Sequence, residues 1–108
     1  MLESRTAALL QPYRDTGECG KLHYPPSQLQ RWLPTFVADG WQLHAHSIGD
    51  GGSLLTIGAA NIFASALEDL DNARPELRHV IAHLQLVRRS DLERLAKLRV
   101  GANFTPIW

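Results

Sequence analysis

Two segments of similar pattern, residues 43–50 and 78–85, constrain the fold of this chain more than any other feature. Each has the short, apolar character of a buried β-strand with a histidine where the strand gives way to a loop, and one helix-length segment separates them. In a sheet built from βα units, the carboxyl ends of the strands meet at one edge. We therefore expect His46 and His83, which occupy these ends, to lie side by side.

The rest of the chain alternates in the same way between helix-length and strand-length patterns. Ser27 is a favourable N-cap, Pro34 predicts a kink or an early break in the first helix, and Gly40 suits a left-handed helix end. Further along, Ser90 and Glu93 match a capping box. The predicted elements are a helix at 27–39, a strand at 41–46, a helix at 53–70, a strand at 79–84, a helix at 90–97 and a strand at 100–105.

This order of elements predicts an α/β fold of about three βα units, because alternating elements form parallel strands joined by right-handed crossovers. A complete barrel of eight such units needs about 250 residues, and the chain has 108. We therefore expect a partial (β/α)8 TIM-barrel fragment that makes up a single partial domain over residues 1–108. Residues 1–26, interrupted by prolines and glycines, are predicted as an irregular lead-in, and residues 27–108 carry the helix–strand repeats.

Charge and composition exclude several classes of protein. Eleven basic and eleven acidic residues cancel at pH 7, so we expect neither nucleic-acid binding nor attachment to an anionic membrane. No apolar run approaches the ~20 residues that a membrane-spanning helix needs, and the N-terminus lacks the apolar core of a signal peptide. A single cysteine, Cys19, forms no internal disulfide and fits a reducing compartment. These features predict a soluble cytoplasmic protein.

The two histidines at the strand ends are candidate metal ligands. Imidazole is a common zinc ligand, but a catalytic zinc site takes three protein ligands and an open position for water. His44 shares a face with His46, and His79 is expected to be packed and hydrogen-bonded. Asp50 is open to two roles, since it could orient a metal-bound imidazole or cap the following helix. The residues alone leave open whether His46 and His83 bind zinc or are ordinary structural histidines.

Three stretches of the chain carry a family resemblance. They are SRTAALLQPY at 4–13, residues 41–50 with HAHSIGD at their end, and residues 78–108 with IAHLQLV, SDLERLAKLRV and ANFTPIW. They resemble, in this order, the segment after the fourth barrel strand, the fifth strand, and the sixth strand through the seventh strand of the amidohydrolase superfamily. The resemblance is to the amidohydrolase-3 branch, which includes N-substituted formamide deformylases. It covers nearly all 108 residues, and the combined order of the motifs is specific.

The resemblance implies that His46 and His83 correspond to the metal-binding histidines of the fifth and sixth strands. The metal of the family, usually zinc, activates a water that attacks a carbonyl and cleaves C–N bonds in small-molecule amides and cyclic amides. The His-x-His motif of the family's first strand, the lysine of its fourth strand and the aspartate of its eighth strand are not among these residues, and Ala82 stands where some relatives carry glutamate. We therefore expect two metal ligands, no catalytic residue, and no activity from this chain alone.

Three interpretations follow from the sequence. The first is a fragment of a metal-dependent amidohydrolase. The second is a non-catalytic regulatory or interaction protein derived from one, similar to exoenzyme regulatory proteins, and the third is an α/β domain with structural histidines. A three-stranded parallel sheet has two open edges and a face that a barrel would bury. We therefore expect a homo-oligomer, or association with the missing barrel segments.

Overall fold

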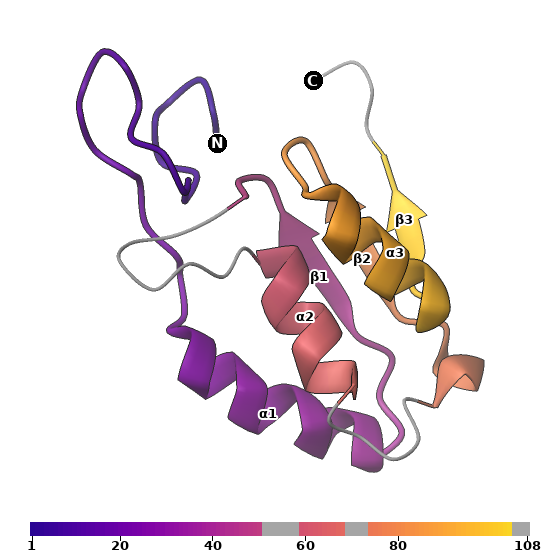
Figure 1. Ribbon diagram of the computed structural model, residues 1–108. Helices are drawn as coiled ribbons and strands as arrows, with labels where there is room; N and C mark the ends of the chain where they lie inside the picture. Colours follow the sequence, from indigo (N-terminus) through magenta and orange to yellow (C-terminus); the bar gives the residue numbers. More distant parts are fainter. Residues whose placement is uncertain (51–58, 69–73, 105–108) are drawn as a thin grey trace.

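Helices and parallel strands alternate along the chain in the computed structural model, which describes residues 1–50, 59–68 and 74–104 (Figure 1). The elements are α1 (Pro26–Ala38), β1 (His44–Ser47), α2 (Ala59–Glu68), the 3-10 helix η1 (Pro75–Leu77), β2 (Val80–His83), α3 (Arg89–Lys97) and β3 (Gly101–Asn103). The strands are hydrogen-bonded in the order β1-β2-β3, and both pairs are parallel. The predicted α/β barrel fragment is therefore confirmed.

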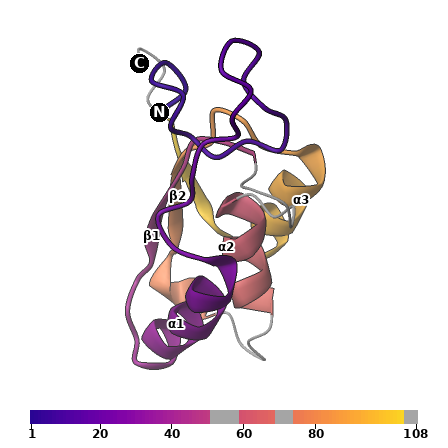
Figure 2. The ribbon, with the colours of Figure 1, turned by 90° about the vertical axis from the view of Figure 1, so that its left-hand side faces the viewer.

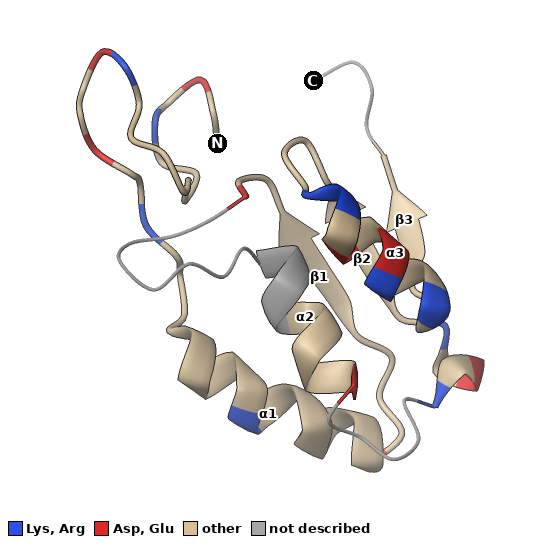
Figure 3. Cartoon of the chain, viewed as in Figure 1, with Lys and Arg blue, Asp and Glu red and all other residues tan. Residues whose placement is uncertain are grey.

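The helices lie on one face of the sheet, and no described segment covers the other face (Figure 2). Exposure alternates along the first strand: Leu43 and Ser47 are buried, whereas His44 and His46 are exposed. Successive side chains of a strand point to opposite faces, so both exposed histidines belong to the uncovered face. The three strands carry no Lys, Arg, Asp or Glu, and the charges lie on the helices and the connecting segments instead (Figure 3).

The hydrophobic core lies between the sheet and the helices. Phe63 and Leu67 of α2 are 2% and 0% exposed, and Ile81 of β2 is 1% exposed. The remaining buried members of this cluster are Val37, Leu43, Ala64, Leu84 and Leu95. Burying a large apolar side chain contributes about 1.5–3 kcal/mol, so this cluster fixes the sheet against α2 and thereby positions the strand ends.

Helix α1 begins one residue before the predicted start. Pro25 is its N-cap residue and Pro26 occupies the first turn, so Ser27 lies inside the helix and its predicted role as a cap is wrong. Proline suits the first turn because its fixed φ is already helical and its missing N–H has no partner there in any case.

The same helix continues past Pro34 to Ala38, so the chain does not break at the internal proline. The apolar side of α1 explains why the helix continues: Val37 is buried in the core, and Leu33 packs against the same cluster. Tertiary packing of one helix face outweighs the loss of a single backbone hydrogen bond. The predicted left-handed helix end is confirmed, because Gly40 has a φ of 89°.

Helix α3 begins at Arg89, with Arg88 as its N-cap residue, and no side chain of the cap donates or accepts a capping hydrogen bond. The predicted capping box is therefore wrong, since Ser90 already lies inside the helix. Asp91 lies in the first turn: its carboxylate is buried, and it pairs with Arg88 at 3.0 Å and with Arg94 at 3.5 Å. A carboxylate in the first turn also interacts favourably with the helix dipole.

The strands are shorter than predicted. β1 begins three residues after the predicted start at 41 and ends one residue past the predicted end at 46, whereas β2 lies inside the predicted range 79–84. β3 lies inside the predicted range 100–105, of which residue 105 is outside the described residues. Part of the predicted helix at 53–70 lies outside the described residues, and α2 falls within the rest. Residues 1–25 form turns and irregular segments. Among the described residues, no helix has the length and apolar character that crossing a bilayer requires.

Candidate metal centre

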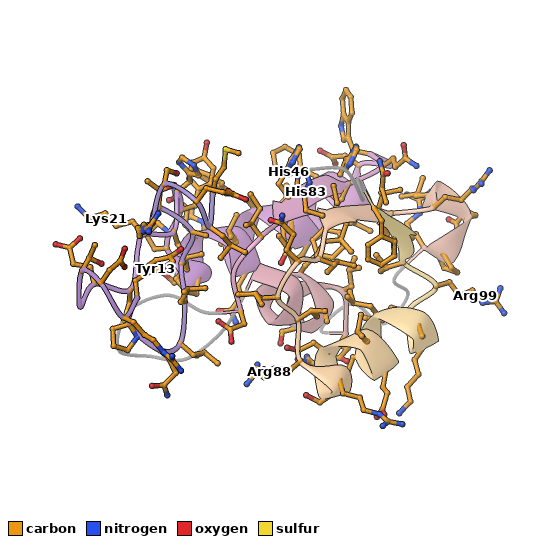
Figure 4. The ribbon with its side chains drawn as sticks, turned by 90° about the horizontal axis from the view of Figure 1, so that it is seen from above. Tyr13, Lys21, His46, His83, Arg88 and Arg99 are labelled. Carbon is orange, nitrogen blue, oxygen red and sulfur yellow. The ribbon has the colours of Figure 1, made fainter. Side chains whose placement is uncertain are left out.

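His46 and His83 lie side by side at the carboxyl ends of β1 and β2. The Nδ1 atom of His46 is 2.8 Å from the Nε2 atom of His83, and the ring centroids are 4.9 Å apart (Figure 4). A hydrogen bond between two imidazole nitrogens needs one N–H and one lone pair, so one ring donates and the other accepts. The structure thus places the two predicted residues within direct contact.

The backbone at the end of β2 makes this contact possible. In the parallel register Ser47 pairs with His83, and His46 pairs with Ala82. Regular alternation would give His83 the same face as buried Ser47, opposite to His46. However, His83 has a φ of 74°, and Leu84 has a φ of 51°. This left-handed backbone ends the alternation, and the imidazole of His83 meets that of His46.

Two further histidines, one in β1 and one directly before β2, have different surroundings. The ring of His44 stacks on that of His46, with centroids 5.7 Å apart and planes 3° from parallel. His44 is therefore on the same face as His46, as predicted, but two residues further from the carboxyl end of β1. His79 is buried, and its Nδ1 accepts a hydrogen bond from the backbone N–H of Leu43 at 3.1 Å. This agrees with the packed, hydrogen-bonded role predicted for His79.

Asp50 has a role that the sequence did not predict. Its Oδ1 atom accepts a hydrogen bond from the backbone N–H of Leu10 at 3.1 Å, which joins the N-terminal segment to the loop after β1. The predicted alternative, a cap on the following helix, concerns residues 51–58, which lie outside the described residues. The Gly49-Asp50 pair signals a turn, but nothing local in the sequence identifies a partner 40 residues away.

The spacing of the paired imidazole nitrogens is close to that of two ligands of one zinc ion. Two nitrogens bound to one tetrahedral zinc lie about 3.3 Å apart, given Zn–N distances of about 2.0–2.1 Å. His46 Nδ1 and His83 Nε2, at 2.8 Å, need to separate by only about 0.5 Å to reach that spacing. Within residues 1–50, 59–68 and 74–104, no group of three or more His, Cys, Asp or Glu side chains converges on a possible metal position. The described residues therefore hold an incomplete ligand set.

A comparison with protein families decides the affiliation of the chain. The family model described as "Amidohydrolase family" matches residues 1–108, the whole sequence. The chain belongs to the amidohydrolase family. A comparison with curated proteins found no match.

Two solved structures resemble this amidohydrolase chain. An uncharacterised metal-dependent hydrolase from Pyrococcus furiosus has a TM-score of 0.69 and 29% sequence identity, over 94% of this chain and 19% of its own. An uncharacterised metal-dependent hydrolase from Pyrococcus horikoshii OT3 has a TM-score of 0.72 and 28% identity, over 96% of this chain and 19% of its own. The amidohydrolase chain thus spans about a fifth of the length of these hydrolases, which agrees with a barrel fragment.

Proposed function

We propose that His46 and His83 are two ligands of a zinc ion in a metal-dependent amidohydrolase that hydrolyses C–N bonds in small-molecule amides or cyclic amides. The observation that carries this proposal is the 2.8 Å approach of His46 Nδ1 and His83 Nε2 at the carboxyl ends of adjacent parallel strands. This edge is where active sites of βα barrels lie. Membership of the amidohydrolase family and two metal-dependent hydrolases as structural neighbours support the same chemistry.

The two histidines would contribute the lone pairs of the nitrogens that now face each other. A zinc ion, when bound, lowers the pKa of its water to about 7 and so supplies hydroxide near neutral pH. Both rings would turn at their strand ends to bind the ion, because the two nitrogens now face each other.

We further propose that this chain has no hydrolytic activity alone. The third ligand and the base that removes a proton from water would come from other parts of a barrel, as the family resemblance implies. The described residues offer no third ligand. The uncovered sheet face and the free edges of β1 and β3 are the surfaces on which a second copy or further barrel strands would pair. A formamide deformylase-like substrate and a cytoplasmic location remain proposals that rest on the sequence resemblance and the single cysteine.

The incomplete ligand set favours one alternative function. A chain whose described residues offer two paired histidines and no third ligand could serve as a non-catalytic regulatory or interaction protein. Its uncharged, uncovered sheet face would then be the contact surface. This alternative requires no metal, so zinc binding separates the two proposals.

Native mass spectrometry with and without added zinc, together with titration calorimetry, tests the assignment. The chain is expected to bind zinc, alone or as an oligomer, and His46→Ala and His83→Ala are each expected to weaken binding at least about ten-fold, because each removes one ligand. His44→Ala is the matched control, because it removes a neighbouring exposed imidazole from the same face. Unchanged zinc stoichiometry and affinity in His83→Ala would overturn the assignment, and absence of zinc from every species would favour the interaction protein.

A further inference from the structure

The N-terminal segment at residues 6–21 closes on itself through hydrogen bonds. The N–H of Leu9 donates to the carbonyl of Cys19 at 2.8 Å, and the N–H of Lys21 donates to that of Thr6 at 3.4 Å. The hydroxyl of Tyr13 donates to the carbonyl of Ala7 at 2.9 Å. These bonds make residues 6–21 one connected unit, although it contains neither helix nor strand. We call it the N-terminal loop.

This loop is attached to the end of β1 at two adjacent residues. Asp50 accepts the hydrogen bond from the backbone N–H of Leu10. Gly49 lies so close to the loop that a Cβ atom built on it would overlap the carbonyl oxygen of Ala8. Ala7 and Ala8 are 7% and 6% exposed, so the attachment is packed as well as hydrogen-bonded.

The attachment puts the N-terminal loop at the same edge of the sheet as the paired histidines. Gly49 and Asp50 follow His46 by three and four residues, on the stretch of chain that leaves the carboxyl end of β1. Figures 1 and 2 show the loop at the carboxyl ends of the strands. Seen from above, Tyr13 and Lys21 lie to one side of His46 and His83 (Figure 4).

We propose that Asp50 is a positioning residue that, together with Gly49, holds the N-terminal loop as a fixed wall on the β1 side of the His46–His83 site, and that this wall limits the size of the group that reaches a bound metal. Three observations carry the proposal: the Asp50–Leu10 hydrogen bond, the close backbone approach at Gly49, and the position of the loop. The size limit rests on the proposed metal site, whereas the attachment by Asp50 does not.

Hydrogen exchange of the whole chain, resolved by residue with NMR, tests the attachment without any metal. Asp50→Ala is expected to speed exchange of the Leu10 amide at least about ten-fold, because that amide loses a charged acceptor. Asp50→Asn keeps an oxygen acceptor and is expected to stay within about three-fold of the unaltered chain. The amide of Ile81, inside the sheet, is the internal reference for global opening. Equal exchange at Leu10 in all three proteins would overturn the attachment.

Glycine substitutions give an independent check that does not alter charge. Gly49→Ala is expected to displace the loop and speed exchange at Leu9 and Leu10. Gly101→Ala is the matched control, because its Cβ would meet the nearest atom, Cγ2 of Val80, at an ordinary 3.5 Å. Similar exchange in both alanine variants would contradict the close approach at Gly49.

The wall itself is tested with hydroxamates, which bind metals through two oxygens, on the chain loaded with Co²⁺. The unaltered chain and Asp50→Asn are expected to bind acetohydroxamate more tightly than a bulky naphthoyl hydroxamate. In Asp50→Ala the ratio of the two affinities is expected to fall by at least about half. A change in global stability alone would not alter that ratio. If Asp50→Ala showed faster exchange at Leu10 and still preferred acetohydroxamate to the same degree, the proposal that the loop limits ligand size would be refuted. Failure to bind Co²⁺ would refute the proposed metal site, and the exchange measurements would still decide the role of Asp50.

Discussion

His46 stands opposite Ala82 in the sheet, yet its imidazole is hydrogen-bonded to that of His83, one residue further along β2. The shift comes from the backbone, because His83 leaves the extended conformation with a φ of 74°. A β-strand that continued regularly would send the two rings to opposite faces. The candidate site therefore depends on a left-handed strand end as much as on the identity of the two residues.

This dependence predicts different costs for two substitutions that both remove the imidazole of His83. Asparagine tolerates the left-handed region, whereas a β-branched residue is strained there. We expect the free energy of unfolding of His83→Val to be about 1–2 kcal/mol lower than that of His83→Asn, which makes the valine variant the less stable one. Urea denaturation followed by circular dichroism measures the difference. Equal stability of the two variants would mean that the left-handed conformation is absent in solution.

The core between α2 and the sheet predicts a large effect at Phe63. Phe63→Ala removes a side chain that is 2% exposed and leaves a cavity, so the free energy of unfolding should fall by about 3–5 kcal/mol. Phe104, which is 60% exposed, is the control, and Phe104→Ala should change stability by no more than about 0.5 kcal/mol. Thermal and urea denaturation of both variants check the prediction, which would be contradicted by similar losses.

The internal proline of α1 predicts a stabilising substitution. Pro34→Ala restores a backbone donor in the middle of the helix and should raise the free energy of unfolding by roughly 1–3 kcal/mol. Pro26→Ala, in the first turn, should be close to neutral because that N–H has no helical partner. Melting temperatures of the two variants provide the comparison. A destabilised Pro34→Ala would show that the proline ring is needed for packing.

The ion pair between α2 and α3 predicts a loss of stability in acid. Arg94 Nε donates to Glu68 Oε1 at 2.8 Å, and this hydrogen bond holds the pKa of Glu68 below its ordinary value of 4.5. Because the folded pKa is depressed, the contribution of the pair is fully present above the unfolded pKa and is lost as the pH falls through the folded pKa. We expect the free energy of unfolding to decline as the pH drops below 4.5.

Denaturation of Glu68→Gln across that pH range identifies the share of the decline that belongs to Glu68. The variant should show a shallower acid decline than the unaltered chain, since its amide does not titrate. Glu93→Gln is the matched control, because Glu93 pairs with Arg89 at 3.4 Å on the exposed side of α3. Its stability should stay within about 0.5 kcal/mol at neutral pH, as is usual for exposed pairs. Parallel pH profiles for the unaltered chain and Glu68→Gln would refute the assignment.

The alternation of helix-length and strand-length segments was sufficient to predict the parallel sheet, because period and length of the apolar pattern are local properties of the chain. The positions of His46 and His83 at neighbouring strand ends followed from the same pattern. Helix starts were less predictable. Ser27 and Ser90 both resemble caps in sequence, but each helix begins one residue earlier, with Pro26 in the first turn of α1 and Asp91 in the first turn of α3.

The sequence by itself therefore determined the α/β class, the order of the elements and the two histidines that share one edge of the sheet. Only the tertiary structure decided that His83 turns toward His46, and that Asp50 joins the N-terminal loop to β1. The physical reason is the range of the interactions. A left-handed φ at a non-glycine residue is imposed by surrounding contacts rather than by its own preference, and a hydrogen bond spanning 40 residues leaves no periodic trace in the sequence.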